Sequence, residues 1–354
     1  MPFSPKPEES NKQIIKAGDI LAFSHMRGNS NPREYAWAFD LVNRWRACHA
    51  YPINTFQSLL RRKIRTGGYT GDPFVAQRLK RLPTIIDKLR RYRSMNLITM
   101  QDIGGLRAVL ENTNDVYRLK NEYQNCRFSH EQIQCRDYIQ CPRDEDGYRS
   151  IHLIYKYKNT SNPNYDDLRL ELQIRTRLQH LWATAVETMG TILGQALKTR
   201  RGEKDWLDFF TLISDAFSIK EGTTRIPRFQ HLEKESLIEE IRRLDNTINA
   251  SSKMSQLSVA IQYLDKRKAN SYHLLVLNSI EQFTMIKSYD RDQYEYAVSD
   301  YQLYEKKAVE GEPIEPVLVS AGKLDSVRKA YPSFFLDISE FLFILQKILA
   351  LKYI

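Results

Sequence analysis

The sequence is poor in cysteine and contains no long hydrophobic run. Its 354 residues include four cysteines, Cys48, Cys126, Cys135 and Cys141, and no CxxC pair. No cysteine follows Cys141, so a cysteine-based zinc site or disulfide framework is excluded from the C-terminal part. The longest apolar run, Phe341–Leu345, is far shorter than the ~20 residues of a membrane span and predicts one face of a packed helix.

Signals for export are missing as well. The N-terminus, MPFSPKPEES, lacks the basic and then apolar pattern of a secretory signal. Together with the few cysteines, this predicts a cytoplasmic protein that does not contact membranes. With 42% hydrophobic and 27% charged residues the chain can build a core, which excludes the disordered and collagen-like classes.

The net charge of +10 is unevenly distributed. Residues 61–100 contain eleven lysines and arginines against Asp72 and Asp87, whereas residues 271–354 contain nine basic and twelve acidic residues. A basic block and an acidic tail predict polyanion binding by the first and self-association with the second. The alternative for the basic block is an ordinary solvated helix face.

Hydrophobic spacing predicts an α+β protein. Helical periodicity covers 34–50, 54–65, 74–94, 177–200, 233–249 and 254–269, and strand-like patterns cover 105–111, 138–141, 151–158 and 168–174. In the last of these, Leu168, Leu170, Leu172 and Ile174 alternate with polar residues, which predicts a half-buried strand. After 270, the runs HLLVLN, FTMIKSYD, YEYAVSDY and PVLVSA are short and β-like, and helices at 323–331 and 336–351 end the chain. The change predicts two domains, 1–268 and 269–354.

Four sequence segments contain the residues suited to chemistry on a nucleotide. They are RLKRLPTIIDKL from Arg78, DIGGLRAVL from Asp102, DGYRSIH from Asp146, and ELQIRT from Glu171 followed by HLWATAVE. Carboxylates on neighbouring strands can hold Mg²⁺, which prefers oxygen ligands and bridges phosphates. Basic side chains on facing elements can neutralise a triphosphate, and a tyrosine after a turn glycine can stack on a base. These parts together indicate phosphoryl transfer.

Each part also has an ordinary structural interpretation. Asp102 can cap a turn, Tyr148 and His152 can be core residues, and Glu171 and Arg175 can form an ion pair on the strand. All four alternatives holding together in this order is improbable. The combination therefore favours an enzyme.

The motifs RxKxxxTIxxKL, DIxGxR, GYRSIH and ELQIRT…HLWA…E resemble the RelA/SpoT-type synthetase domain over residues 34–215. The resemblance implies a nucleotidyltransferase-like mixed sheet flanked by helices, and transfer of the β,γ-pyrophosphate of ATP to a ribose 3′-hydroxyl. It implies Asp102 and Glu171 as catalytic and Mg²⁺-binding carboxylates. The implied ATP ligands are Arg78, Lys80, Lys88 and Arg107, and the implied acceptor ligands are Tyr148, His152, Gln173 and Arg175. The hydrolase domain of long family members is absent from this sequence.

The last 85 residues resemble the antitoxin half of CapRel-type fused toxin–antitoxins of the same family. The likeness rests on a β-rich "pseudo zinc finger" without metal cysteines and on the Tyr-x-x-Tyr motif of Tyr301 and Tyr304. It implies an intramolecular toxin–antitoxin contact in which the two tyrosines inhibit the synthetase. We expect the motif to be helical or turn-like, because residues three apart then share one face. On a strand they would be ordinary residues of a sheet.

This second resemblance implies tRNA as the acceptor and a phage structural (capsid) protein as the trigger of an antiviral response. The 3′-terminal CCA adenosine would be modified, which blocks translation. Phosphate contacts dominate nucleic-acid affinity, so the basic block, with Arg61, Arg62, Lys63 and Arg65, is the expected tRNA-binding region. Two alternatives stay open. The acceptor can be a free nucleotide, as in alarmone synthesis, or the domain can be a non-catalytic regulatory module.

Overall fold

A five-stranded mixed sheet forms the centre of the computed structural model, which describes residues 3–24, 31–192, 204–248, 250–251, 254, 272–278, 283–312, 314–320 and 339–350. Its order is β1-β2-β5-β4-β3, with β2 and β5 parallel and the other neighbours antiparallel. The strands are β1 (Phe74–Leu79), β2 (Gly104–Leu110), β3 (Glu131–Asp137), β4 (Ile151–Lys156) and β5 (Arg169–Thr176). The expected mixed sheet flanked by helices is confirmed.

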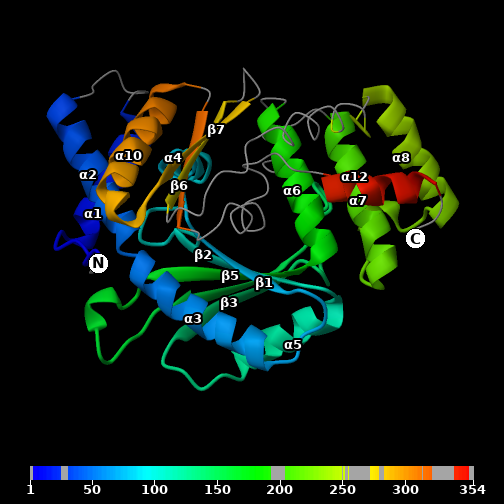
Figure 1. Ribbon diagram of the computed structural model, residues 1–354, viewed down its shortest axis with the longest axis horizontal. Helices are drawn as coiled ribbons and strands as arrows, with labels where there is room; N and C mark the ends of the chain where they lie inside the picture. The colour runs from blue at the N-terminus through cyan, green and yellow to red at the C-terminus, as the bar shows by residue number, and fades with distance from the viewer. Residues whose placement is uncertain are drawn as a thin grey trace.

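Helices cover both faces of this sheet (Figure 1). The helices before β5 are α1 (Asn11–Phe23), α2 (Pro32–Ala47), α3 (Ala50–Thr66), α4 (Leu82–Arg91) and α5 (Thr113–Gln124). Apolar residues of α3 and α5, such as Phe56 and Leu119, pack with the apolar sheet face, including Leu172. A Cβ at Gly104 would meet Leu170 at 2.6 Å and Ile53 of α3 at 3.1 Å, so the close approach of α3 needs glycine there.

A second hydrophobic cluster joins helices from distant parts of the sequence. It contains α6 (Arg177–Ile192), α7 (Lys204–Glu221), α8 (Lys234–Ile248) and α12 (Ser339–Leu349). The run Phe341–Leu345 lies on α12 and buries Phe341 and Leu345, which confirms the packed helix. Among the residues that the structure describes, no helix is both long and apolar enough to cross a bilayer.

The tail also forms a small antiparallel sheet of order β7-β6-β8, made by β6 (Tyr272–Asn278), β7 (Phe283–Tyr289) and β8 (Ile314–Ser320). Helix α10 (Tyr294–Glu310) packs on it and buries Ala297 and Tyr301. The chain therefore returns to both sides of the molecule: β6–β8 and α10 lie beside α2 and α4, and α12 lies beside α7 (Figure 1).

Several sequence expectations were wrong. The region 74–94 is not one helix, because 74–79 pairs with β2 as strand β1 before α4 begins. Residues 138–141 form a turn after β3, and YEYAVSDY belongs to α10 rather than to a strand. Strand β5 is not half-buried, because its polar face is covered too: Glu171 is 8% exposed and Arg175 is 2% exposed.

Other expectations are confirmed or lie elsewhere. The helices at 34–50, 54–65 and 233–249 are present as α2, α3 and α8, and the closing helix at 336–351 is present as α12. The expected helix at 323–331 and nearly all of the one at 254–269 lie outside the described residues. Helix α1 was not predicted, although Ser10 and Gln13 at its start form a capping box that a sequence can reveal.

Candidate active site

The polar face of the central sheet collects the chemically suited side chains. Pairing places Arg78 beside Gly105 and Gly105 beside Glu171, while Arg107 pairs with Gln173. Residues paired across neighbouring strands project from the same face of a sheet. The register continues to His152 on β4, which is paired with Gln173. One face therefore carries side chains from four of the sequence motifs.

Asp102 lies just before β2 and is held by two lysines. Lys80 Nζ lies 2.9 Å from Oδ2 and Lys88 Nζ lies 2.9 Å from Oδ1. Lys80 follows β1 and Lys88 comes from the last turns of α4, so the carboxylate joins two elements. Although burial opposes ionisation, these two cations hold the pKa of Asp102 below its usual range. Burial lowers the pKa of Lys80 despite the neighbouring carboxylate.

Glu171 forms the second carboxylate of the face. His152 Nδ1 lies 2.9 Å from its Oε1, and Gln173 Nε2 donates to its Oε2 at 2.8 Å. Burial opposes its ionisation, but His152 lowers the pKa of Glu171 to about 2. The charge of Asp102 also acts on Glu171, so the two carboxylates are close enough to interact. The side chain is an anion at neutral pH.

The imidazole of His152 connects Glu171 to Tyr148. Its Nε2 lies 2.8 Å from the tyrosine hydroxyl. Burial alone would lower the pKa of His152, yet Tyr148 and Glu171 raise it to about 9. For Tyr148 burial acts in the opposite direction, and His152 with Arg175 lowers its pKa to about 8. His152 is thus a buried cation between two partners, not an inert core histidine.

Helix α7 fixes the turn that precedes β4. Gly147 has a φ of 72°, and a Cβ there would meet the Thr211 backbone at 3.1 Å, so only glycine fits. Ser214 donates to the Gly147 carbonyl at 2.6 Å, and Arg149 donates to Ser214 at 3.1 Å. The sequence interpretation missed this support, because nothing local in 204–221 indicates which turn the helix contacts.

Arg175 points a buried guanidinium along the same face. Its Nη2 lies 2.6 Å from His180 Nδ1 on α6, so the ion pair with Glu171 that the sequence left open does not form. Burial and the nearby Arg107 lower the pKa of Arg175 well below its usual value. Clustered arginines with this unfavourable electrostatics are suited to polyphosphate.

The donor set fits a magnesium ion held jointly with a substrate. Asp102 and Glu171 supply ionised oxygen ligands, the type that Mg²⁺ prefers. No group of three or more His, Cys, Asp or Glu side chains within the described ranges is arranged as a complete metal site. Two carboxylates are enough when phosphates and water supply the other ligands.

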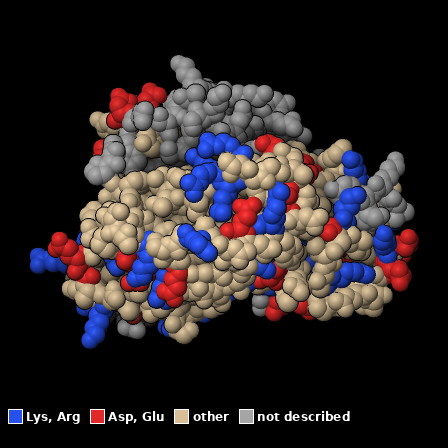
Figure 2. All heavy atoms as spheres, turned by 90° about the horizontal axis from the view of Figure 1, so that it is seen from below, with Lys and Arg blue, Asp and Glu red and all other residues tan. Residues whose placement is uncertain are grey.

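The basic residues of α3 lie apart from this face. Arg61, Arg62 and Arg65 are exposed, while Lys63 is 3.6 Å from Glu122 and lies over the ring of Tyr123. Because α3 covers the apolar side of the sheet, the structure does not bring the block together with the carboxylates. Figure 2 views this underside, where basic groups alternate with acidic side chains.

Tyr301 contacts the first half of the chain, and Tyr304 does not. Both lie on α10, which confirms the helical motif. The hydroxyl of Tyr301 accepts from Arg46 Nη1 at 2.9 Å and donates to Glu305 Oε1 at 2.6 Å. Tyr304 instead reaches Met285 Sδ on the small sheet at 3.7 Å. The two rings therefore have different surroundings.

Glu305 is the centre of the contact between α10 and α4. Its Oε1 accepts from Arg46 Nη1 at 2.5 Å and from the backbone N–H of Leu82 at 2.7 Å, and the residue is fully buried. Leu82 begins α4, whose own N-cap residue, Arg81, supplies no side-chain cap. A carboxylate from another domain thus takes the role of the helix cap. Sequence reasoning missed Arg46 and Glu305, because their partners are more than 200 residues away.

Residues 77–189 match the model of the region found in RelA / SpoT proteins. This segment contains Asp102, Glu171 and the residues paired around them. The GTP pyrophosphokinase YjbM of Bacillus subtilis (strain 168) is 37% identical over 114 residues, 31% of this chain and 53% of that protein. YwaC, a GTP pyrophosphokinase of the same strain, is 29% identical over 116 residues, 30% of this chain and 52% of that protein. The chain spans about half the length of these curated relatives.

Among solved structures, the small alarmone synthetase 1 from Bacillus subtilis bound to its product pppGpp aligns with a TM-score of 0.44 and 25% identity. The alignment covers 53% of this chain and 94% of that one.

Proposed function

We propose that this protein is an ATP-dependent pyrophosphokinase. The observation that supports it most is one sheet face with two ionised carboxylates, Asp102 and Glu171, among arginines and lysines, inside the segment that matches the RelA / SpoT region. In this proposal Arg78, Lys80, Lys88 and Arg107 bind ATP, and Tyr148, His152, Gln173 and Arg175 bind the acceptor.

The reaction joins the acceptor's 3′-oxygen to the β-phosphorus of ATP. The bond from that phosphorus to the oxygen bridging it to the α-phosphate breaks, and AMP leaves with the electron pair. Glu171 accepts the proton of the attacking hydroxyl, aided by His152 at its other side. The arginines neutralise the triphosphate, since such transfer depends mainly on position and charge. Mg²⁺, when bound by Asp102 and Glu171, adds charge neutralisation at the phosphates.

We propose the 3′-terminal CCA adenosine of tRNA as the acceptor. The excess of basic residues in 61–100 supports a polyanion. The printed names of the relatives, both GTP pyrophosphokinases, favour the second candidate, a free nucleotide acceptor. Incubating the protein with γ-labelled ATP and either tRNA or GTP distinguishes them: label in tRNA supports the first, and label only in GTP replaces it.

The proposal extends to control by the tail. Residues 269–354 act as an antitoxin domain of the pseudo zinc finger type, without metal, on a toxin domain of residues 1–268. A phage capsid-type protein releases it in the cytoplasm and stops translation. The contact of Tyr301 and Glu305 with α2 and α4 supports an intramolecular brake. Cells expressing Tyr301→Ala/Tyr304→Ala should stop growing without a trigger; growth equal to wild type at matched protein levels contradicts the brake.

A further inference from the structure

The guanidinium of Arg143 lies over the ring of Tyr148. Its Cζ is 4.6 Å from the ring centroid. The two residues face each other across a closed turn, because the Gly147 N–H donates to the Arg143 carbonyl at 2.9 Å and the Arg143 N–H donates to the Tyr148 carbonyl at 3.5 Å. The stacking is therefore a consequence of how the backbone of this turn closes.

Every part of the turn except the Arg143 side chain is fixed. The buried Asp146 accepts from the Tyr148 N–H at 3.1 Å, Ser214 donates to the Gly147 carbonyl, and the Tyr148 hydroxyl is bonded to His152. The ring of Tyr148 is thus held in one orientation before any ligand arrives, which lowers the cost of stacking on it.

The Arg143 side chain is held more weakly. It makes one ion pair, from Nη2 to Asp146 at 2.9 Å, and its side chain is 32% exposed. Its Nε is buried and has no hydrogen-bond partner within the described part of the chain. Moving this guanidinium into water costs a partly exposed ion pair and a cation–π contact, both small.

A base and this guanidinium cannot share the ring face. Stacked carbon atoms are about 3.5–4.0 Å apart, so a base between the two groups needs about 7 Å. The observed 4.6 Å leaves no such space. Stacking of a base on this face requires that Arg143 leave it.

We propose that Arg143 is a gating residue, which covers the base-stacking face of Tyr148 until a purine nucleotide acceptor displaces it. The inference rests on the proposed function, in which Tyr148 stacks the acceptor base. Arg143 then sets the acceptor affinity by competition, not by contact with the reacting atoms, and weakly stacking bases are rejected.

The test measures acceptor KM, ATP KM and kcat for the full chain with Arg143→Ala, using GTP and tRNA as acceptors in separate arms. Removing the competitor should lower the acceptor KM by about two- to fivefold, with kcat and the ATP KM unchanged. Direct binding of the trinucleotide CCA and of GDP should tighten by the same factor. Arg143→Lys, which keeps the ion pair but is not planar, should give an intermediate effect and serves if Arg143→Ala folds poorly.

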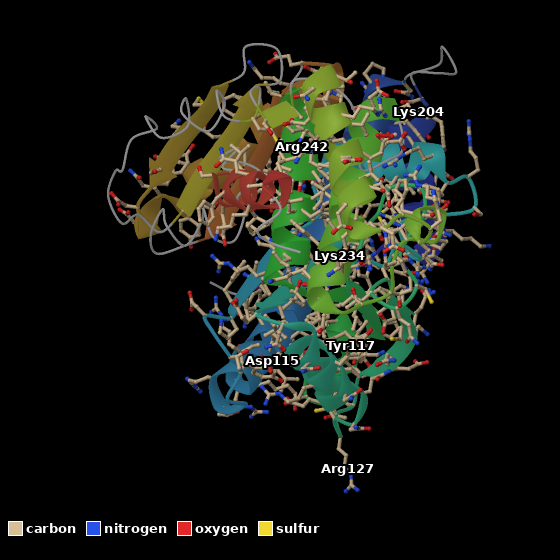
Figure 3. All side chains as sticks on the ribbon, turned by 90° about the vertical axis from the view of Figure 1, so that its right-hand side faces the viewer. Asp115, Tyr117, Arg127, Lys204, Lys234 and Arg242 are labelled. Carbon is tan, nitrogen blue, oxygen red and sulfur yellow. The ribbon has the colours of Figure 1, made fainter. Side chains whose placement is uncertain are left out.

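Arg118→Ala is the matched control. Arg118 also pairs with an aspartate three residues away, Asp115 at 3.0 Å, and lies 4.0 Å over the ring of Tyr69. It lies on α5, near Asp115 at the lower end of Figure 3, and should change no constant. An unchanged or raised acceptor KM in Arg143→Ala overturns the gate and leaves the proposed function standing. A wild-type protein that labels no acceptor removes both.

Discussion

Both carboxylates of the candidate site are held by cations of the protein itself. Asp102 is held by Lys80 and Lys88, and Glu171 is held by His152. Buried charges need such partners, because an isolated ionised carboxylate would be too costly. The same lysines are proposed ATP ligands, so nucleotide binding must exchange a carboxylate for phosphate oxygens.

Replacing either carboxylate by its amide should remove the activity. Asp102→Asn or Glu171→Gln keeps the size of the side chain and removes its charge, so pyrophosphate transfer from labelled ATP should fall by at least about 100-fold. Asp87→Asn is the control, since Asp87 lies on α4 and pairs with Arg91 at 2.5 Å. Near-wild-type transfer in a pure, folded variant contradicts the assignment of that carboxylate.

His49, at the junction of α2 and α3, should make the protein sensitive to acid. It is buried and its Nδ1 bonds the Trp45 carbonyl at 2.8 Å, and burial lowers its pKa from 6.5 to about 4. Between these values the unfolded chain binds a proton at His49 and the folded chain does not. The free energy of unfolding therefore falls as the pH falls from 6.5 to 4, by up to about 3 kcal/mol.

Urea unfolding of His49→Gln at several pH values measures this contribution. The glutamine can donate to the same carbonyl, so the variant should lose less stability than wild type between pH 6.5 and 4. His231→Gln, at an exposed position, is the control. Equal slopes for wild type and His49→Gln contradict the prediction.

At the scale of the element, the clearest lesson concerns β1 and α4. The spacing of apolar residues over 74–94 is compatible with one helix, and only pairing with β2, about 30 residues later, makes the first part a strand. Strand β5 was predictable because its alternation is local. The cover on its polar face was not, because that depends on α6 and on side chains from other motifs. Register between strands thus decides the candidate site more than any local pattern.

Helix α10 should lose its place on α4 when Glu305 loses its charge. Glu305→Gln leaves the buried Arg46 without its counter-charge, which should lower the free energy of unfolding by about 3–5 kcal/mol. Urea unfolding of the full chain measures it. Glu310→Gln, exposed on the same helix, should cost less than about 1 kcal/mol. Arg46→Met/Glu305→Met should recover part of the loss. A Glu305→Gln variant as stable as Glu310→Gln contradicts the role of this contact.

At the scale of the whole molecule, charge and chemistry occupy different layers. The sequence indicated the carboxylates and their basic neighbours, since each motif is short and continuous. It placed the block at 61–65 beside them, because residues near in the sequence were assumed near in space. The sheet separates them, with α3 on its apolar side. A tRNA that contacts both must extend around the edge of the sheet.

Arg61→Glu/Arg62→Glu/Arg65→Glu tests this extended contact. These residues are exposed, so the fold should survive, whereas Lys63 is kept because it pairs with Glu122. The slope of log affinity for tRNA against log salt should fall by about 0.7–0.9 for each lost phosphate contact. Arg242→Glu/Arg243→Glu on α8, at the other end of the molecule in Figure 3, is the control. An unchanged slope contradicts tRNA binding by α3.

Helices α8 and α12 pack in the same cluster, and Arg177 holds Glu340 at the start of α12 at 2.6 Å. The unit of β6–β8 and α10 lies between them in the sequence, so it is tied to the helical cluster at both ends. Undocking of α10 therefore does not release it into solution. Tethered partners meet at effective concentrations on the order of millimolar, whatever the concentration of the protein. Dilution cannot activate such a molecule, and the contact reforms as soon as a competing ligand leaves.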